Sequence, residues 1–137
     1  MNDEERLKEI EEALEDLIHL SDDHILLIEG LKDKRALESL GIGGEVFMIQ
    51  AEGGPIKASE YVSEHGGKAV ILTDWDRRGG TMAKELEIQL SSLGAEFDTS
   101  VRTRLSILCR KYIKDVESLD TLMERLTANA MGIKGRI

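Results

Sequence analysis

Three acidic residues stand where two short apolar segments end. Glu29 comes directly after residues 25–28, and Asp74 and Asp76 follow residues 69–72. Such apolar runs, each leading into a glycine-containing loop, are typical of buried parallel strands. The carboxyl ends of parallel strands meet at the edge of an open α/β sheet where ligands bind. Three carboxylates there would repel one another unless a cation joined them, so the sequence predicts a site for a hard divalent metal.

Asp74 and Asp76 are two residues apart, a spacing that places both side chains on one side of an extended segment. Two such carboxylates, completed by a substrate phosphate, suit Mg²⁺, with Mn²⁺ as an alternative. Without the metal we expect at least one carboxyl group of the cluster to have a raised pKa, because like charges repel. The alternative is structural: Asp76 caps the following helix and Asp74 is a polar surface residue.

Glu29 would ligate the metal or act as a general acid or base. Its alternative role is a strand-end carboxylate in an ion pair with Lys32 or Arg35. Lys32, Arg77 and Arg78 lie beside the acidic residues in the sequence and would hold phosphate oxygens, unless they are plain surface charges. The glycines that would let the backbone approach a ligand closely are Gly30 and Gly79.

The negative charge of the chain is concentrated at one end. The formal net charge is −9, but residues 1–23 hold ten acidic and two basic residues, whereas the remaining 114 residues hold 17 acidic and 16 basic ones. Within that near-neutral part, five basic residues follow one another without an acidic one: Arg102, Arg104, Arg110, Lys111 and Lys114. This run either meets phosphates or forms a solvated helix face.

The apolar pattern predicts strands that alternate with helices, and hence a parallel sheet covered on both faces. Residues 3–20 show the apolar spacing of an amphipathic helix that packs on the body of the domain or on a partner subunit. We therefore divide the chain into an N-terminal acidic helix (1–23) and a globular domain (24–137). The expected strands are 24–28, 46–49, 69–73 and 96–97. The expected helices are 33–40, 56–65, 81–93, 100–110 and 116–127, and the tail from Gly132 is expected to be loose.

Length and composition indicate one globular domain. The chain has 137 residues, of which 41% are hydrophobic and 33% charged, and no apolar run approaches the ~20 residues of a membrane helix. The acidic N-terminus is unlike a signal or transit peptide. The single Cys109 has no partner for an internal disulfide and is expected to fill space in the core. These features predict a cytoplasmic protein without a membrane partner.

In two segments the chain resembles the Toprim domain, which topoisomerases, bacterial primases and several nucleases share. The residues that match its first motif are Glu29, Gly30, Asp33, Ala36 and Leu37. Those that match its second motif are Asp74, Asp76 and Gly79, and the separation of the two motifs also agrees. The resemblance covers residues 24–115. It implies a Rossmann-type open sheet of about four parallel strands between helices, with the acidic helix added, and Mg²⁺-dependent chemistry on phosphodiesters.

Within that superfamily the chain is similar to the small stand-alone Toprim proteins of archaea and bacteria, and to the Toprim part of the ribonuclease that matures precursor ribosomal RNA. Two departures stand out. Asp115 occupies the place of a glycine before Val116-Glu117, which leaves the role of Glu117 open. Glu52 precedes two glycines where relatives have a small polar residue, and we expect its side chain to face solvent.

The function expected from these features is that of a small Mg²⁺-dependent nuclease acting on structured RNA. Glu29, Asp74 and Asp76 would be its catalytic and metal-binding residues. A non-catalytic module that binds nucleic acid or a nucleotide and recruits a larger enzyme is the main alternative, and a hydrolase of small phosphorylated compounds is a third. The N-terminal helix would serve a protein partner or self-association. The sequence leaves open whether the substrate is RNA or DNA.

Overall fold

Four parallel strands form an open sheet, as the sequence predicts, and their order in the sheet is β2-β1-β3-β4. The computed structural model describes residues 1–132, so nearly all of the expected loose tail lies outside the described residues. The strands are β1 (Ile25–Ile28), β2 (Val46–Met48), β3 (Lys68–Ile71) and β4 (Glu96–Asp98). Each is short and its central residues are apolar, which suits a sheet that is buried on both faces.

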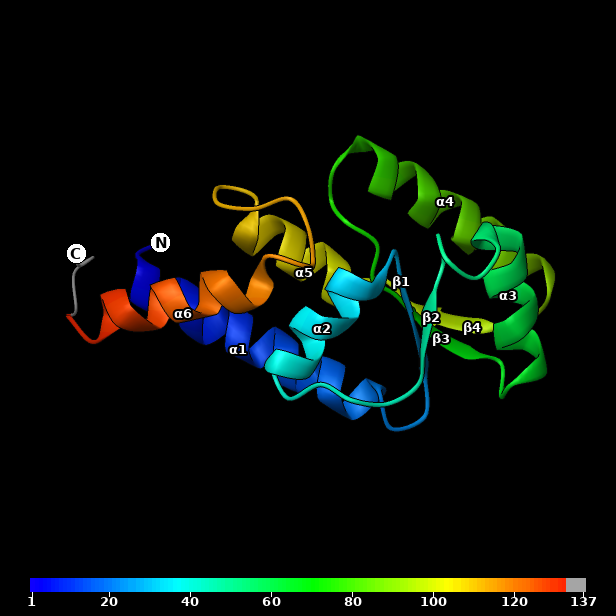
Figure 1. Cartoon of the computed structure of the whole chain (residues 1–137), viewed down its shortest axis with the longest axis horizontal. Helices are drawn as coiled ribbons and strands as arrows, with labels where there is room; N and C mark the ends of the chain where they lie inside the picture. The colour runs from blue at the N-terminus through cyan, green and yellow to red at the C-terminus, as the bar shows by residue number, and fades with distance from the viewer. Residues whose placement is uncertain (133–137) are drawn as a thin grey trace.

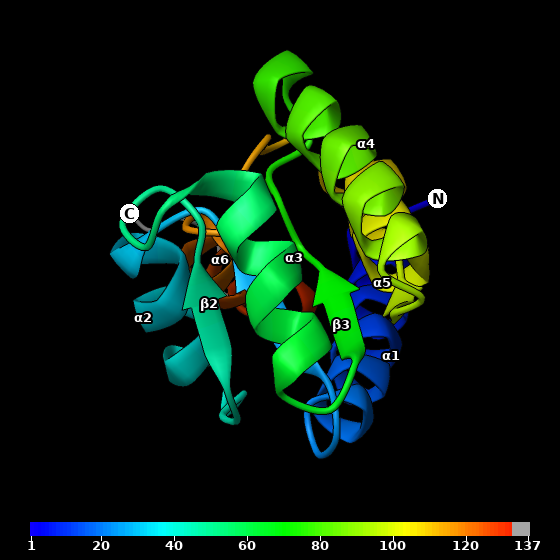
Figure 2. The same cartoon turned by 90° about the vertical axis from the view of Figure 1, so that its right-hand side faces the viewer.

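Helices cover both faces of this sheet (Figures 1 and 2). They are α1 (Asp3–Leu20), α2 (Leu31–Ser39), α3 (Gly54–Glu64), α4 (Arg77–Ser92), α5 (Ser100–Cys109) and α6 (Leu119–Ala130). Four of them begin at other positions than expected: α2 and α3 begin two residues earlier, α4 begins four residues earlier and α6 three residues later. None of the helices in the described part of the chain is long and apolar enough to cross a membrane.

Alternate residues of the central strands supply two separate cores. Leu26 and Ile28 of β1 join Val70 of β3 in a cluster with α1, α2, α5 and α6. Leu27 of β1 and Ile71 of β3 point the other way, into a cluster with α3 and α4. The period of two in the side-chain direction of a strand produces this division. The apolar runs around residues 25–28 and 69–72 are continuous because both of their faces are covered.

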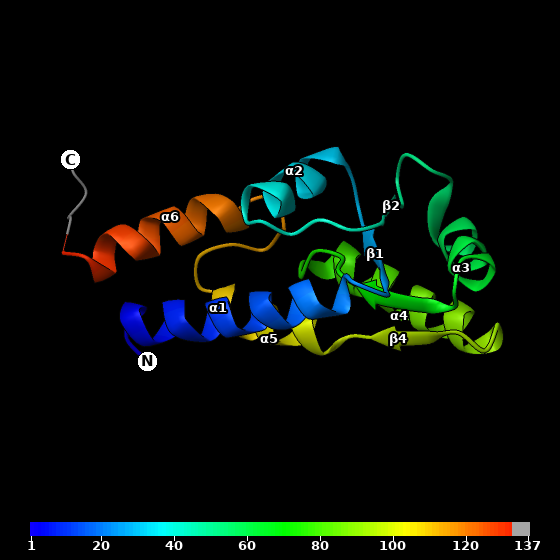
Figure 3. The same cartoon turned by 90° about the horizontal axis from the view of Figure 1, so that it is seen from below.

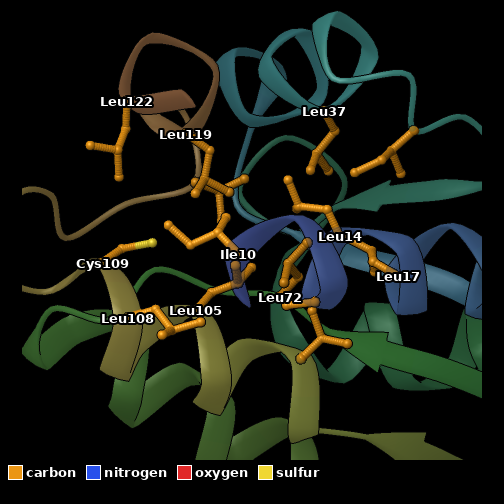
Figure 4. Packing of buried hydrophobic residues seen from close by; sticks show 14 of the residues in the cluster. Ile10, Leu14, Leu17, Leu37, Leu72, Leu105, Leu108, Cys109, Leu119 and Leu122 are labelled. Atoms are coloured by element: carbon orange, nitrogen blue, oxygen red, sulfur yellow. The ribbon is translucent and has the colours of Figure 1, made fainter. Parts of the chain in front are cut away.

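Helix α1 is part of the first core rather than an appendage. Its buried side chains are Ile10, Ala13, Leu14 and Leu17, all at helical spacing. Figure 4 shows Ile10, Leu14 and Leu17 among leucines of α2, α5 and α6, and Figure 3 shows α1 running beside α5. The sequence left two positions open for this helix, on the body of the domain or on a partner subunit, and α1 packs on the body of the domain. Cys109 is also fully buried in this core, as expected, and burial raises the pKa of its thiol to about 12.

The ends of β1 and β3 lie at the point of the sheet where the strand order reverses. From β1 the chain moves to β2 at one edge, then passes back over β1 to β3 and continues to β4 at the other edge. The direction of progress therefore reverses between β1 and β3. The crevice outside the carboxyl ends of strands at such a switch point is the usual ligand site of open α/β sheets.

The start of α4 brings a helix directly against the end of β3. Asp76 is the N-cap of α4, and its Oδ1 accepts a hydrogen bond from the Gly79 amide at 2.7 Å. The Thr73 hydroxyl donates to the Gly79 carbonyl oxygen at 2.8 Å. A Cβ atom at position 79 would lie only 1.9 Å from the Asp74 carbonyl oxygen. Glycine is therefore required at position 79 for this helix to pass so close to Asp74.

We predict that Gly79→Ala and Gly80→Ala have opposite effects on stability. Alanine at position 79 collides with the Asp74 backbone and should lower the free energy of unfolding by about 2 to 4 kcal/mol. At position 80 the nearest atom to a new Cβ is the Arg102 Nη2 at 4.0 Å, and alanine should stabilise the helix by up to about 1 kcal/mol. Urea denaturation followed by Trp75 fluorescence measures both. Equal stabilities would mean that the backbone beside Asp74 yields at little cost.

Candidate functional site

A cleft of about 420 Å³ opens at the switch point, beyond the ends of β1 and β3. Four carboxylates, three basic side chains and one amide are among the residues that line it: Glu29, Asp33, Asp74, Glu117, Lys32, Arg35, Arg78 and Gln50. These groups come from four places in the sequence: the ends of the first three strands and their following segments, and the loop before α6. The cleft therefore gathers the polar groups that the sheet delivers to this edge.

Glu29 joins the ends of the two central strands. Its side chain is only 5% exposed, and its Oε2 accepts a hydrogen bond from the Asp74 amide at 2.8 Å. Its Oε1 accepts longer hydrogen bonds from Arg78 Nη2 at 3.3 Å and Gln50 Nε2 at 3.4 Å. A buried carboxylate is tolerated when both oxygens have donors of this kind. Glu29 is thus fixed in position, with one oxygen turned toward exposed, movable partners.

Asp74 is held from two sides. Its Oδ1 accepts a hydrogen bond from the Val116 amide at 2.9 Å, and its carbonyl oxygen accepts one from Arg102 Nη2 at 2.7 Å. Arg102 Nε also donates to the Thr73 carbonyl oxygen at 2.9 Å, so the guanidinium clamps the end of β3. Arg102 belongs to the basic run of the sequence, but its role here is to position the site. The Arg102 pKa is lowered by burial, against the opposing pull of Glu29 and neighbouring carboxylates.

The pKa of Asp74 is raised to about 7, chiefly by burial and further by the nearby charges of Glu29, Asp33 and Asp115. The hydrogen bond from the Val116 amide acts in the opposite direction. The expectation that one carboxyl group of the cluster has a raised pKa is confirmed. Loss of hydration contributes more than the charge repulsion on which that expectation rested.

Asp33 is a fourth acidic residue that sequence reasoning did not place in the site. Its Oδ2 accepts a hydrogen bond from the Gly30 amide at 2.9 Å and so caps the start of α2. Burial raises its pKa, and the charges of Glu29 and Glu117 add to that effect. The signal was present, because Asp33 lies one helical turn after Glu29 and belongs to the matched motif. Gly30 is one of the two glycines expected to let the backbone approach a ligand closely, and its amide is occupied by this cap.

Gln50 and Glu117 also belong to the cleft, and Glu52 does not. Gln50 follows β2, which neighbours β1, and this register brings its amide to Glu29. Glu117 reaches the cleft from the loop before α6, and its role stays open. Glu52 is exposed to solvent, as expected, and accepts a hydrogen bond from the Met48 amide at 2.8 Å.

The remaining predicted residues divide between the cleft and its surroundings. Lys32 and Arg78 line the cleft, whereas Arg77 is exposed beside a neighbouring hollow between α3 and α4. Asp76 does not line the cleft, because it caps α4. The structure therefore brings Glu29 and Asp74 together with Asp33 and Glu117, and places Asp76 outside them. The metal-ligand role of Asp76 stays a prediction.

The basic run of residues 102–114 does not form one surface. Arg102 is used inside the site, and Arg104 forms an ion pair with Asp16 of α1. Lys111 lies 5.6 Å from the centre of the Tyr112 ring. The run is thus divided among three structural roles, so it does not form one continuous phosphate-binding helix face.

The donor atoms of the cleft fit a hard cation held through water. Within residues 1–132, no three His, Cys, Asp or Glu side chains are arranged to enclose a metal ion. Mg²⁺ does not need such a cage, because one or two carboxylates with water and substrate phosphate complete its coordination. Glu29 and Asp74 supply two adjacent carboxylates of this kind. They are the residues that would hold Mg²⁺.

We predict that Asp74→Asn stabilises the protein in a pH-dependent way. The folded state raises the pKa of Asp74 from 3.8 to about 7, so it binds the proton more tightly than the unfolded chain does. Stability is therefore lost as the pH rises from about 4 through about 7, where folded Asp74 must ionise. Asparagine keeps an oxygen for the Val116 amide and avoids this loss.

Urea denaturation at several pH values tests this. The Asn variant should match the wild type near pH 4 and exceed it at about pH 8. Asp22→Asn, at an exposed position before β1, controls for the removal of a carboxylate as such. A stability difference that does not change with pH would contradict the raised pKa.

Comparison with known proteins places the chain among archaeal relatives, although no family model matches it. It is 38% identical to the UPF0292 protein of Methanosarcina barkeri over 122 residues, which are 88% of this chain and 85% of that protein. It is 29% identical to the UPF0292 protein of Methanocaldococcus jannaschii over 87% of this chain and 93% of that one. A solved structure of a protein from Aquifex aeolicus superposes with a TM-score of 0.67 at 25% identity, over 79% of this chain and 95% of its own. The chain belongs to the UPF0292 family.

Proposed function

We propose that this protein is a Toprim-type, Mg²⁺-dependent nuclease that cleaves phosphodiester bonds in structured RNA. The observation that carries the proposal is the pairing of Glu29 and Asp74 at the switch point of the sheet, where the Asp74 amide donates to Glu29 at 2.8 Å. The two residues come from the two motifs on which the Toprim resemblance rests. Their neighbourhood is a cleft that also contains basic side chains suited to phosphate.

Each residue of the cleft has a role in this proposal. Glu29 and Asp74 would hold Mg²⁺, or Mn²⁺ in its place, and the metal would polarise a phosphoryl oxygen and favour ionisation of water. Asp74, with its pKa raised to about 7, would give up its proton when the cation binds. Glu29, buried and held by three donors, is placed to accept or return a proton.

Basic side chains at the rim of the cleft would bind the phosphates. The Arg78 side chain is 70% exposed and reaches Glu29 at 3.3 Å, so it can turn from the carboxylate to a phosphate oxygen without unfolding the helix start. Lys32 lies on the opposite side of the cleft, in the first turn of α2. Together they would set the position of the strand that is cut.

A non-catalytic nucleic-acid module is the second candidate, because both central carboxylates also have structural work. Glu29 ties β1 to β3, and Asp74 ties β3 to the loop before α6. Such bonds would be kept in a protein that only binds. A partner protein of such a module would meet the charged outer face of α1, since the apolar stripe of that helix is buried in its own domain.

We predict that Glu29→Gln abolishes cleavage and preserves binding. The amide keeps the size of the side chain but removes a metal ligand and proton acceptor, so the cleavage rate of folded RNAs in Mg²⁺ should fall about a hundredfold or more. Binding, measured in EDTA, should stay the same or tighten, because one charge that repels phosphate is gone.

Glu52→Gln is the matched control, since it removes an exposed carboxylate from the same edge of the sheet outside the cleft. It should cleave as the wild type does. A wild-type protein that binds folded RNAs and DNAs but cuts none of them in Mg²⁺ or Mn²⁺ would support the non-catalytic candidate instead.

A further inference from the structure

A groove of about 510 Å³ between α2 and α6 continues the acidic cleft away from the sheet. Lys32, Arg35 and Glu117 line both the cleft and the groove, so the two are one connected depression. Figures 1 and 3 show α2 next to the start of α6, and residues of both helices line the groove. Any chain-like ligand that enters the cleft can therefore extend along these helices.

The charged side chains of this groove favour an anionic occupant. Three of them are basic and exposed, namely Lys32, Arg35 and Arg125, and none of the three forms an ion pair with another residue in the described range 1–132. The acidic residues there are Glu117 and Asp120. Because the Asp120 carboxylate accepts a hydrogen bond from the Thr121 amide at 2.8 Å, it serves the start of α6. The three basic side chains remain available to solvent and to ligands.

Arg125 is the basic group at this end of the groove. Its guanidinium lies 5.0 Å from the centre of the Tyr112 ring, a cation–π contact that restricts its side chain. Ser118 and Thr121 at the start of α6 also line the groove, but their amides already donate to Asp115 at 3.0 Å and to Asp120 at 2.8 Å. An anion at this point would therefore be bound by Arg125.

The surface of α1 is an unfavourable path for a polyanion that leaves the cleft. Helix α1, on the same side of the sheet, carries most of the net negative charge, and its Glu11, Glu12 and Glu15 are exposed. Phosphates would be repelled there. The volume of the groove is that of a small-molecule pocket, which suits one strand of nucleic acid rather than a duplex.

We propose that a single strand of RNA adjoining the cleavage point leaves the cleft along the α2–α6 groove, with its phosphates bound by Arg35 and Arg125. This inference rests on the proposed function and adds the direction and the single-stranded form of the flanking substrate. Arg35 and Arg125 are binding residues in it, 90 positions apart in the sequence and joined by the packing of α2 on α6.

The test compares a blunt labelled RNA hairpin with a tailed form of it, made in two versions that carry a single-stranded tail of about eight nucleotides at one end or at the other. Affinity is measured by fluorescence anisotropy in EDTA, so that binding is separated from cleavage. One of the tails should tighten wild-type binding about tenfold. In Arg35→Gln/Arg125→Gln that gain should disappear, and the slope of log affinity against log salt should fall by about 1.4, which corresponds to two single-strand phosphate contacts. The blunt hairpin should bind both proteins equally.

Lys57→Gln/Lys84→Gln is the matched control, because it removes two exposed basic residues from α3 and α4 on the other face of the sheet. It should keep the full gain from the tail. Arg35→Gln alone leaves the Arg125–Tyr112 contact in place and should lose about half of the gain on a logarithmic scale. The single variant protects the test against a double variant that folds poorly, which circular dichroism would reveal.

Two outcomes would overturn the proposed path. The groove is not the exit if the wild type gains no affinity from either tail, or if the double arginine variant keeps the gain. In either case, cleavage of the blunt hairpin would show that the nuclease function stands without the groove. If the wild type binds neither hairpin and cuts neither, the proposed function fails, and the path fails with it.

Discussion

The hydrogen bond from the Asp74 amide to the Glu29 carboxylate is the contact on which the rest of the site depends. It spans 2.8 Å between the ends of β1 and β3, where the direction of the sheet reverses. This bond holds the backbone after β3 against the end of β1. Asp76 then caps α4, and Gly79 passes against the Asp74 carbonyl oxygen at a distance that excludes any side chain. A residue at position 29 that cannot accept this hydrogen bond would loosen the contact between the ends of β1 and β3.

The negative charges of the site are opposed by nearby basic groups but are not cancelled by them. Glu29, Asp33, Asp74 and Glu117 share one cleft, and Asp74 responds with a pKa raised to about 7. Arg102 lies behind Asp74 and binds backbone oxygens, while the exposed Arg78 side chain reaches Glu29 from the solvent side. An ionised carboxylate that is buried is costly unless a proton or a cation accompanies it. In the proposed function, Mg²⁺ would take the place of the proton on Asp74.

Much of the scaffold followed from the sequence, because it depends on local patterns. The apolar runs before Glu29 and Asp74 predict strands, and adjacent parallel strands bring the residues that follow them to one edge. The role of Asp76 was harder to assign, since the same Asp-x-Asp spacing fits two ligands in an extended segment or one ligand and one helix cap. The choice depends on whether α4 begins at residue 77 or 81. It begins at 77, so Asp76 is the cap of α4, and a further role of Asp76 as a metal ligand stays a prediction.

Other members of the site could not be found from local patterns. Gln50 reaches Glu29 because β2 pairs with β1, and Glu117 arrives from a loop 88 residues later in the chain. Arg102 looked like part of a basic surface, yet its guanidinium binds two carbonyl oxygens after β3. Each of these positions is a consequence of strand order and helix packing, which a linear sequence does not display.

The most direct test of this account is a ¹³C NMR titration of the Asp74 side-chain carboxyl, with and without Mg²⁺. The account predicts a midpoint near pH 7 in the metal-free protein, and a lower midpoint in Mg²⁺, because a cation at the cleft favours the ionised form. Assignment by comparison with Asp74→Asn identifies the signal. A midpoint near the ordinary aspartate value of about 4, unchanged by Mg²⁺, would contradict the claim that Glu29 and Asp74 form a cation site.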